Sequence, residues 1–390
     1  MIPYGKQNIS EEDIEAVVKV LRSDFITQGP TLPRFEKAIA THTGAQHCVA
    51  VNSATSALHI GLLSLDVGPG DLVWTSPITF VASSNAALYC GADVDFVDIC
   101  PDTFNMDMSA LAAKLELAQV AGRLPKVVIP VHLTGRSCDM KALDALRKTY
   151  GFKVIEDASH AIGADYEGLP VGSCTYSDLC VFSFHPVKII TTGEGGALTT
   201  NDPALGRRLA SLRSHGITRD TDEMERNDGP WYYEQLSLGF NYRMTEIQAA
   251  LGLSQMSRLD AFVARRRELA ARYDSILSDS EFLRPVLDTD QNRSAWHLYI
   301  VRLPEGSTPL ARGHLFEKLR SDGIGVNVHY IPVTRQPYYR KLGFDPLQFP
   351  VAEDYYERAI SIPLYYDMTE SQQDMVVKCL LEPAGYQTIF

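Results

Sequence analysis

The chain has 390 residues, of which 45% are hydrophobic, and it carries a formal net charge of −12. This length favours two domains with a sizeable core. Acidic and basic residues are mixed along the sequence, which argues against nucleic acid as a partner because such a partner requires a basic surface.

The cysteine pattern and the start of the chain indicate a cytoplasmic protein. The seven cysteines are odd in number and form no C-x-x-C pair, so we expect reduced and mostly buried thiols. The first residues, MIPYGKQNISEEDIE, lack the basic and apolar regions of a signal peptide, and no apolar run is long enough to span a membrane. We therefore expect a protein that is neither exported nor membrane-bound.

Residues 10–23, SEEDIEAVVKVLRS, predict an amphipathic helix near the start of the chain. Ser10 and Asp13 form a capping-box pattern, and four apolar residues that follow fall on one face. We expect residues 1–30 to form an arm and helix that pack on a larger domain.

Residues 47–201 predict an α/β domain. Short apolar runs alternate there with segments of helical length, and the runs are HCVAVN, DLVWTS, DVDFVDI, KVVIPVHL, KVIEDA, LCVFSFH and GALTTN. Strands that are apolar on both faces favour a mainly parallel sheet, here of seven strands, covered by helices on both sides. We expect this large domain to span residues 31–259.

The pattern changes after GFNYR. Residues 244–277 predict a long helical stretch, and shorter strand and helix patterns alternate beyond it. We expect residues 260–390 to form a smaller α+β domain.

Polar residues that directly follow the apolar runs mark candidate sites, because ligands of open α/β sheets bind at the carboxyl ends of the strands. The first is AVNSATSAL, residues 50–58, where a strand gives way to small hydroxylated residues and a helix. The free amides at this helix start would form an anion cradle. Alternatively, Ser53 or Thr55 simply caps the helix.

The second place is KVIEDASHAIG, residues 153–163. Asp157 ends a buried strand, where it would either bond to local amides or partner a cationic ring nitrogen. His160 follows, and a histidine here is more often a core or loop residue than a functional one.

The third place is SFHPVKIITTGEGGALTT, residues 183–200, which contains Lys188. A loop lysine is ordinarily a solvated charge. Here the preceding residues are apolar, Pro186 stiffens the loop and three glycines let backbone approach a ligand. A partly desolvated lysine has a lowered pKa, which makes its amine a nucleophile towards carbonyls.

The fourth place is GFNYR, where Asn241 and Arg243 precede a predicted helix and either one could cap it. Together the first three places provide a phosphate cradle, an aspartate for a pyridinium nitrogen and an amine for an aldehyde, which are the groups that pyridoxal phosphate requires. Motifs of other chemistries are missing, namely G-x-S-x-G, the Walker loop, the metal-binding H-E-x-x-H and a G-x-G-x-x-G after a first strand. We expect no metal site.

These motifs resemble a known family. NSATSALH, EDASHAIGA, SFHPVK with TTGEGG, RSHGI, GFNYRMTEIQAALG and GVNVHYIPV are similar to the sugar aminotransferases of the DegT/DnrJ/EryC1/StrS family, over nearly the whole chain. The resemblance implies the fold type I architecture of aspartate aminotransferase. It also implies pyridoxal 5'-phosphate as cofactor, with pyridoxamine 5'-phosphate as its intermediate form.

By this resemblance Lys188 is the Schiff-base lysine, Asp157 contacts the pyridinium nitrogen, His160 lies near the cofactor hydroxyl and Phe80 stacks on the ring. These assignments make Lys188, Asp157 and His160 the catalytic residues.

The resemblance also implies a phosphate site formed by Ala54, Thr55 and Ser183. Asn241 would reach the phosphate of the neighbouring subunit, which implies a homodimer with shared active sites.

Within the family, the wording of NSATSALH, DASHA, SFHPVK and GIGVNVHY is most similar to members that act in pseudaminic acid biosynthesis. This implies L-glutamate as amino donor and a UDP-linked 4-keto sugar as acceptor. One departure is that Thr334 and Arg335 follow HYIPV, where many relatives carry histidine. The implied substrate residues are Tyr4, Asp24, Phe25, Ile26, Thr27, His329 and Tyr330.

Several alternatives remain open from the sequence. A related 4- or 3-aminotransferase could act on another nucleotide sugar, since cofactor motifs do not read the sugar. A dehydratase of the same fold is disfavoured by Lys188, because such relatives carry histidine there. A non-catalytic cofactor-binding protein and a nicotinamide-dependent oxidoreductase are disfavoured by the intact motifs and by the missing dinucleotide fingerprint.

Overall fold

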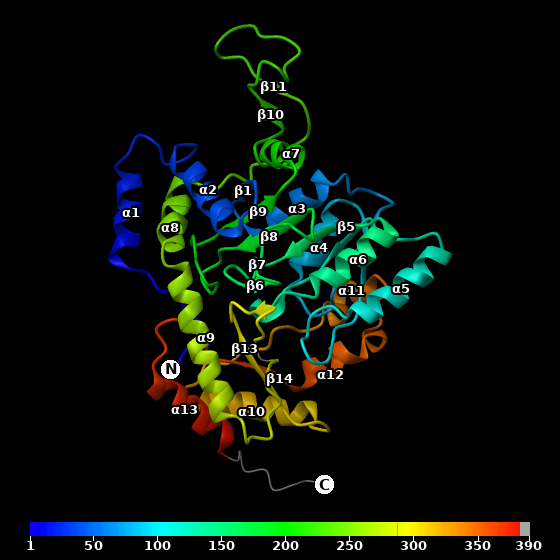
Figure 1. Cartoon of the computed structure of the whole chain (residues 1–390), viewed down its shortest axis with the longest axis vertical. Coiled ribbons are helices and arrows are strands. Elements are labelled where there is room, and N and C mark those ends of the chain that lie inside the picture. Colours follow the sequence, from blue (N-terminus) through cyan, green and yellow to red (C-terminus); the bar gives the residue numbers. More distant parts are fainter. Residues whose placement is uncertain (287, 383–390) are drawn as a thin grey trace.

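The computed structural model describes residues 1–286 and 288–382, and a seven-stranded sheet lies at its centre (Figure 1). The spatial order is β1-β9-β8-β5-β4-β2-β3. The strands are β1 (His47–Val51), β2 (Leu72–Thr75), β3 (Asp93–Phe96), β4 (Val127–Ile129), β5 (Lys153–Asp157), β8 (Leu179–Ser183) and β9 (Gly196–Thr200). Only β9 runs antiparallel to its neighbours. The predicted mainly parallel sheet is confirmed, strand by strand.

Both faces of the sheet are buried, as the apolar runs predicted. In β8, Leu179 and Val181 belong to one hydrophobic cluster, whereas Cys180 and Phe182 belong to another, because successive side chains of a strand point to opposite faces. The covering helices are α2 (Thr31–Thr43), α3 (Ala54–Ser64), α4 (Ala82–Tyr89), α5 (Met108–Val120), α6 (Met140–Tyr150), α7 (Pro203–Arg213) and α8 (Glu246–Met256).

A second hydrophobic cluster forms around the elements that follow α8. These are α9 (Leu259–Ile276), β13 (Tyr299–Arg302), α10 (Pro309–Ser321), β14 (Ala359–Ile362) and α13 (Glu370–Leu381). The start of the chain joins this cluster, since Ile2 is buried in it and its amide donates to the carbonyl of Gly323 at 2.8 Å. The division between the two domains at residues 259 and 260 stays a prediction. The last eight residues of the predicted small domain, 383–390, lie outside the described residues.

The remaining described elements are short or peripheral. They are α1 (Glu11–Leu21), α11 (Pro337–Lys341), α12 (Pro350–Arg358), β6 (Asp165–Tyr166), β7 (Leu169–Pro170), β10 (Ile217–Thr218), β11 (Glu234–Gln235), β12 (Asn292–Arg293) and three 3-10 turns, at Leu133–Gly135, Val333–Arg335 and Pro346–Gln348. The predicted capping box of Ser10 and Asp13 is present at the start of α1.

Two local expectations need correction. The predicted long helical stretch at residues 244–277 is two helices, α8 and α9, which are separated at Ser257 and Arg258. Neither Asn241 nor Arg243 caps α8, because Thr245 and Gln248 form its capping box.

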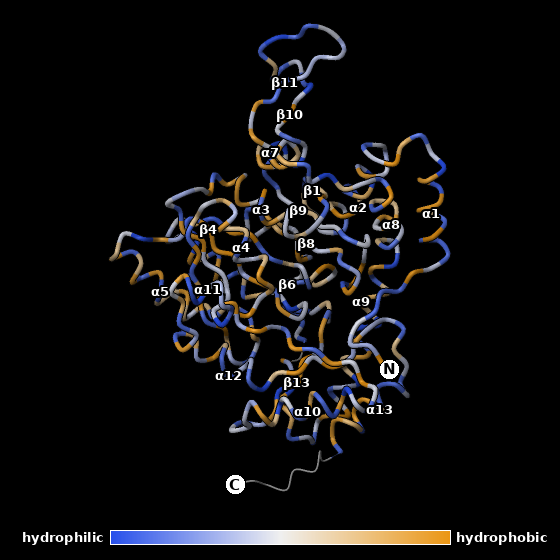
Figure 2. Tube along the Cα trace, turned by 180° about the vertical axis from the view of Figure 1, so that it is seen from behind, coloured by the Kyte–Doolittle hydropathy of each residue, from blue (hydrophilic) through white to orange (hydrophobic). Residues whose placement is uncertain are grey.

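The β10–β11 hairpin projects from the body beyond α7 (Figure 1). Its outer loop is hydrophilic, whereas hydrophobic segments gather in the strands and helices of the body (Figure 2). No helix in residues 1–286 and 288–382 is long and apolar enough to cross a membrane.

Candidate active site

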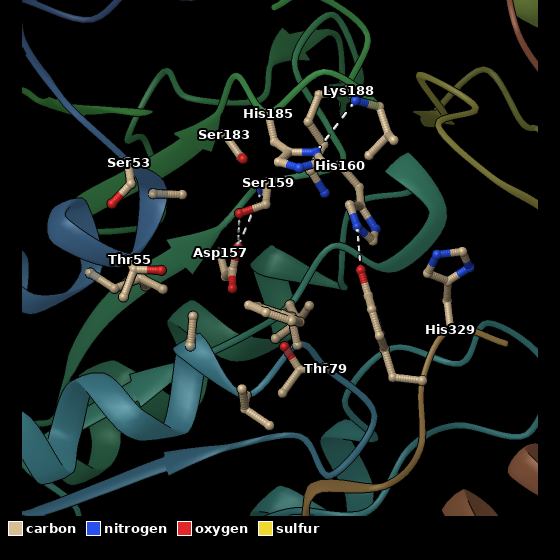
Figure 3. A pocket seen from close by; sticks show the side chains of 18 of the residues that line it. Ser53, Thr55, Thr79, Asp157, Ser159, His160, Ser183, His185, Lys188 and His329 are labelled. Carbon is tan, nitrogen blue, oxygen red and sulfur yellow. Dashed lines mark hydrogen bonds between the residues drawn. The ribbon is translucent and has the colours of Figure 1, made fainter. Parts of the chain in front are cut away.

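A cavity of about 930 Å³ opens at the carboxyl ends of β5 and β8, beside the start of α3 (Figure 3). Most of the residues that the sequence singled out line it, although they come from distant parts of the chain. They are Tyr4, Ala54, Thr55, Phe80, Asp157, His160, Ser183, Lys188, His329 and Tyr330.

The start of α3 provides the predicted anion cradle. The Ser53 hydroxyl caps the helix by accepting from the Ser56 amide at 3.1 Å, and the first intrahelical bond runs from the Ala57 amide to the Ser53 carbonyl at 3.0 Å. The amides of Ala54 and Thr55 precede this bond, so they are free of intrahelical acceptors and carry the positive end of the helix dipole. Ser53 therefore caps the helix and leaves two amides for an anion.

Gly196, the first residue of β9, lets the sheet approach this helix start. A Cβ atom at Gly196 would lie 2.6 Å from the Ala54 nitrogen and 2.7 Å from the Ser53 carbonyl carbon. These are backbone atoms and cannot rotate away. The glycine therefore fixes the position of the anion-binding amides relative to β8 and β9.

Gly196→Ala is expected to displace the start of α3. We expect the affinity for a phosphate-bearing ligand to fall about tenfold and the stability to fall by about 1–3 kcal/mol, the usual cost of overpacking. Fluorescence titration with the ligand and thermal unfolding measure the two effects. Gly68→Ala is the matched control, because a Cβ there meets nothing within 4 Å, and equal behaviour of both variants would contradict the packing argument.

Asp157 ends β5 at the floor of the cavity and is buried. Its Oδ1 accepts from the Ser159 hydroxyl at 2.6 Å and from the Ser159 amide at 3.2 Å, and its Oδ2 accepts from the Ser83 hydroxyl at 2.6 Å. The hydrogen bonds of Asp157 are therefore only partly local, since Ser159 is a near neighbour in the sequence whereas Ser83 comes from α4. A carboxylate held in this way can still accept a bond from a ligand in the cavity.

Lys188 lies on the loop between β8 and β9, and its side chain reaches the same cavity (Figure 3). Burial lowers its pKa from 10.5 to about 8, although the charge of Asp157 favours the protonated amine. A substantial fraction is therefore neutral near physiological pH, and only the neutral amine attacks a carbonyl. Lys188 is not the solvated loop lysine of the alternative interpretation.

This pKa predicts how the stability of the ligand-free protein depends on pH. Between pH 8 and 10.5 the unfolded chain holds a proton on this lysine that the folded chain has released, so the free energy of unfolding rises with pH. Lys188→Met removes the titrating group. We expect this variant to be more stable than the wild type below the window and to lose that advantage across it. Denaturant titrations below, within and above the window measure the difference, and a constant difference would contradict desolvation of the amine.

His160 is a buried neutral imidazole rather than a cation. Its Nε2 lies 3.0 Å from the Tyr330 hydroxyl, and its Nδ1 is buried without a hydrogen-bond partner among the described residues. Burial, with the nearby Lys188 charge, lowers the pKa of His160 well below its usual value. An unpartnered ring nitrogen at a cavity wall is available to a ligand.

Two aromatic contacts complete the wall. Phe80 is 59% exposed, with its ring centroid 6.3 Å from that of Tyr330, so a large apolar face is open to the cavity. The Tyr4 ring lies 5.5 Å from that of His329, and both line the cavity. The start of the chain thus reaches the site.

Some cavity residues were not singled out from the sequence. Thr79, Ser159, Asn327 and Gln336 line the cavity, and the buried His297 ring lies 4.4 Å from that of His160. Ser159 was detectable as a neighbour of Asp157. Thr79 was detectable as well, since it follows the predicted strand DLVWTS by three residues.

Other predicted residues do not line this cavity. Asp24, Phe25, Ile26 and Thr27 are all exposed in the loop after α1, and Asn241 is exposed beside the hairpin, where it pairs with Ser214. The role of the segment from Asp24 to Thr27 in the sugar-nucleotide pocket stays a prediction. Thr334 is buried, and Arg335 pairs with Glu353 and Glu357.

Comparisons with known proteins agree with this geometry. The DegT/DnrJ/EryC1/StrS aminotransferase family matches residues 7–381. SpsC of Bacillus subtilis, a spore coat polysaccharide biosynthesis protein, is 40% identical over 381 residues, which cover 97% of this chain and 96% of that protein.

Solved structures are similar over almost the whole chain. Spr1654 of Streptococcus pneumoniae in its PLP form has a TM-score of 0.88 and 33% identity, covering 97% of both chains. PseC of Helicobacter pylori, an aminotransferase involved in the biosynthesis of pseudoaminic acid, has a TM-score of 0.88 and 32% identity, covering 97% of this chain and 98% of that one. The chain therefore belongs to the DegT/DnrJ/EryC1/StrS aminotransferase family and has the type I fold of pyridoxal phosphate-dependent transferases.

Proposed function

We propose that this chain is a pyridoxal phosphate-dependent enzyme that moves an amino group from L-glutamate to C4 of a UDP-linked 4-keto-6-deoxy sugar in pseudaminic acid biosynthesis. One observation carries the chemistry: a partly neutral lysine amine, a buried aspartate and the free amides of a helix start face one cavity. Each group corresponds to a different part of the cofactor.

The residues of the cavity fit this cofactor. Ala54 and Thr55 offer amides for the phosphate, with Ser183 beside them. Asp157 would accept a hydrogen bond from the protonated ring nitrogen, and the exposed face of Phe80 would pack on the ring. His160 would meet the cofactor hydroxyl with a nitrogen that has no partner in the described chain.

When bound, pyridoxal phosphate supplies an aldehyde that bonds to amines and a ring that accepts the electrons released when the donor loses its α-proton. Lys188 would hold the cofactor through its Nζ until the amine of L-glutamate takes its place, and the free Nζ would then accept the proton from the donor α-carbon. The same Nζ would then act as the general acid that gives this proton back. Asp157 keeps the ring nitrogen protonated. With a keto sugar as acceptor, Lys188 would deliver the proton to C4 of the sugar.

The choice of sugar rests on similarity and on space. The 32% identity to PseC supports the pseudaminic acid pathway, and the cavity of about 930 Å³ has room for a sugar beside the cofactor. The 40% identity to SpsC supports the alternative, another nucleotide sugar of a different polysaccharide pathway, with a 4- or 3-keto group.

The protein is further proposed to work as a homodimer. Asn241 is exposed next to the projecting β10–β11 hairpin and lies outside its own cavity. Asp24 to Thr27 are exposed in the same chain, two of them apolar. In a homodimer, Asn241 and the segment from Asp24 to Thr27 would reach the cavity of the partner subunit, since they do not reach the cavity of their own chain.

The test is the absorbance spectrum of the purified protein with pyridoxal phosphate, before and after L-glutamate. Glutamate should convert the bound cofactor to its amine form, and a keto sugar that is a substrate should restore the original spectrum. Recovery only with UDP-2-acetamido-2,6-dideoxy-β-L-arabino-hex-4-ulose supports the full proposal. Recovery with another sugar would correct the substrate alone, and absence of any cofactor complex would overturn the reaction.

A further inference from the structure

Asp157 receives a hydrogen bond from a residue that no motif marked. Ser83 lies on α4, 74 residues earlier in the chain, is fully buried, and places its hydroxyl 2.6 Å from Oδ2 of Asp157. Thr79 lies four residues before Ser83, just ahead of α4, and its hydroxyl is 2.7 Å from the Ser83 hydroxyl. Thr79 lines the cavity, whereas Ser83 stands behind it.

The direction of these bonds follows from the number of protons. A serine hydroxyl has one hydrogen, and a carboxylate oxygen only accepts. The Phe80 carbonyl oxygen is a second acceptor at 3.4 Å, but Oδ2 of Asp157 is much nearer at 2.6 Å, so the hydrogen of Ser83 points to Asp157. The Thr79 hydroxyl must then donate to Ser83. The result is a chain of two hydroxyls that both direct positive dipoles towards one carboxylate oxygen, and hydrogen bonds in such chains strengthen one another.

We propose that Ser83, oriented by Thr79, is a positioning residue that holds the Asp157 carboxylate in the charge state and orientation needed by the cofactor ring nitrogen. This inference rests on the proposed function, because it assigns Asp157 to that nitrogen. Ser159 holds the other oxygen, Oδ1, so the two serines fix the plane of the carboxylate between them. Without Ser83 the carboxylate would lose a donor and would compete more strongly for the ring proton.

The neighbouring serine provides a matched control. Ser84 is as deeply buried as Ser83 and lies on the same helix, but its hydroxyl donates to the Val81 carbonyl at 3.0 Å and accepts from Tyr339 at 2.7 Å. It makes no bond to Asp157. Ser83→Ala and Ser84→Ala thus both remove a buried hydroxyl from α4. Only Ser83→Ala also removes the hydrogen bond to Asp157.

Three other titratable groups interact electrostatically with Asp157, and all are unchanged in these variants. They are Lys188, Tyr330 and Cys180. A change in the titration of the bound cofactor can therefore be assigned to the substituted hydroxyl.

The experiment compares the wild type, S83A, S84A, T79V and T79S as full-length proteins loaded with pyridoxal phosphate. The first readout is the pH titration of the cofactor absorbance, with cofactor Kd measured alongside, and the second is kcat and KM for L-glutamate. We expect S83A to shift the titration by about one pH unit and to lower kcat about tenfold, with KM changed less than about twofold. T79V should change the titration and kcat in the same direction as S83A but by a smaller amount. T79S and S84A should match the wild type.

The outcomes separate this inference from the proposed function. A wild type that binds no cofactor would overturn the proposed function itself. A wild type that binds and turns over, combined with an S83A titration and kcat equal to those of S84A, would overturn the role of Ser83 alone. An effect of T79V as large as that of S83A would contradict the proposed order of the chain.

Discussion

Lys188→Ala is expected to bind pyridoxal phosphate and to turn nothing over. The substitution removes both the amine that bonds to the aldehyde and the group that moves the proton, and the proton transfer alone contributes about 10²–10⁴-fold. The cofactor should still bind, because the phosphate amides at Ala54 and Thr55 and the carboxylate of Asp157 remain. Cofactor binding by equilibrium dialysis, together with single-turnover and steady-state rates, measures the two effects separately.

A control variant guards against a general effect of losing a lysine. Lys141 is on the surface, where its amine lies 3.8 Å from Glu167, and Lys141→Ala should retain the wild-type rate. Multiple turnovers by Lys188→Ala would remove this lysine from the mechanism. If Lys188→Ala fails to bind the cofactor, thermal unfolding of the ligand-free variant will show whether it has also failed to fold.

Asp157→Asn is expected to leave phosphate binding largely intact while slowing turnover. A charge-assisted hydrogen bond contributes about 1.5–3 kcal/mol, so its loss predicts a decrease of roughly ten- to hundredfold in kcat. Asparagine keeps the size of the side chain but cannot keep a ring nitrogen protonated through its charge. Steady-state kinetics and cofactor titration measure the rate and the affinity.

Asp202→Asn is the matched control for this substitution. Asp202 caps α7 by accepting from the Ala204 amide at 2.7 Å, and asparagine is an equally good cap. We expect no change in rate or in unfolding temperature. A wild-type rate in Asp157→Asn would show that this carboxylate takes no part in proton transfer.

Much of the fold could be predicted because its determinants are local. Each of the seven central strands lies within an apolar run, since a strand that is buried on both faces is mostly apolar along its length. The Ser10 capping box is likewise read from four consecutive residues. The break between α8 and α9 could not be found in this way, because residues 254–260 contain no glycine or proline and their helical pattern is uninterrupted.

The candidate site was partly predictable for a different reason. Asp157 and Ser183 lie at the ends of predicted strands, and Ala54 and Lys188 follow such strands. The carboxyl ends of parallel strands gather at one edge of a sheet. Ser83 and His297 carry no such signal. Ser83 is one of two adjacent serines in a helix, and only the position of α4 relative to Asp157 decides which one meets that carboxylate.

The sequence by itself determined the strands, the capping box of α1 and the set of chemical groups, because these depend on neighbours a few residues apart. The tertiary structure alone decided which groups share a cavity, and with it the pKa of Lys188, since desolvation depends on everything that surrounds the amine. It also decided the start of α2, where the distant Glu246 of α8 accepts from the Thr31 and Leu32 amides. Such contacts join residues more than 200 positions apart, and no local pattern encodes them.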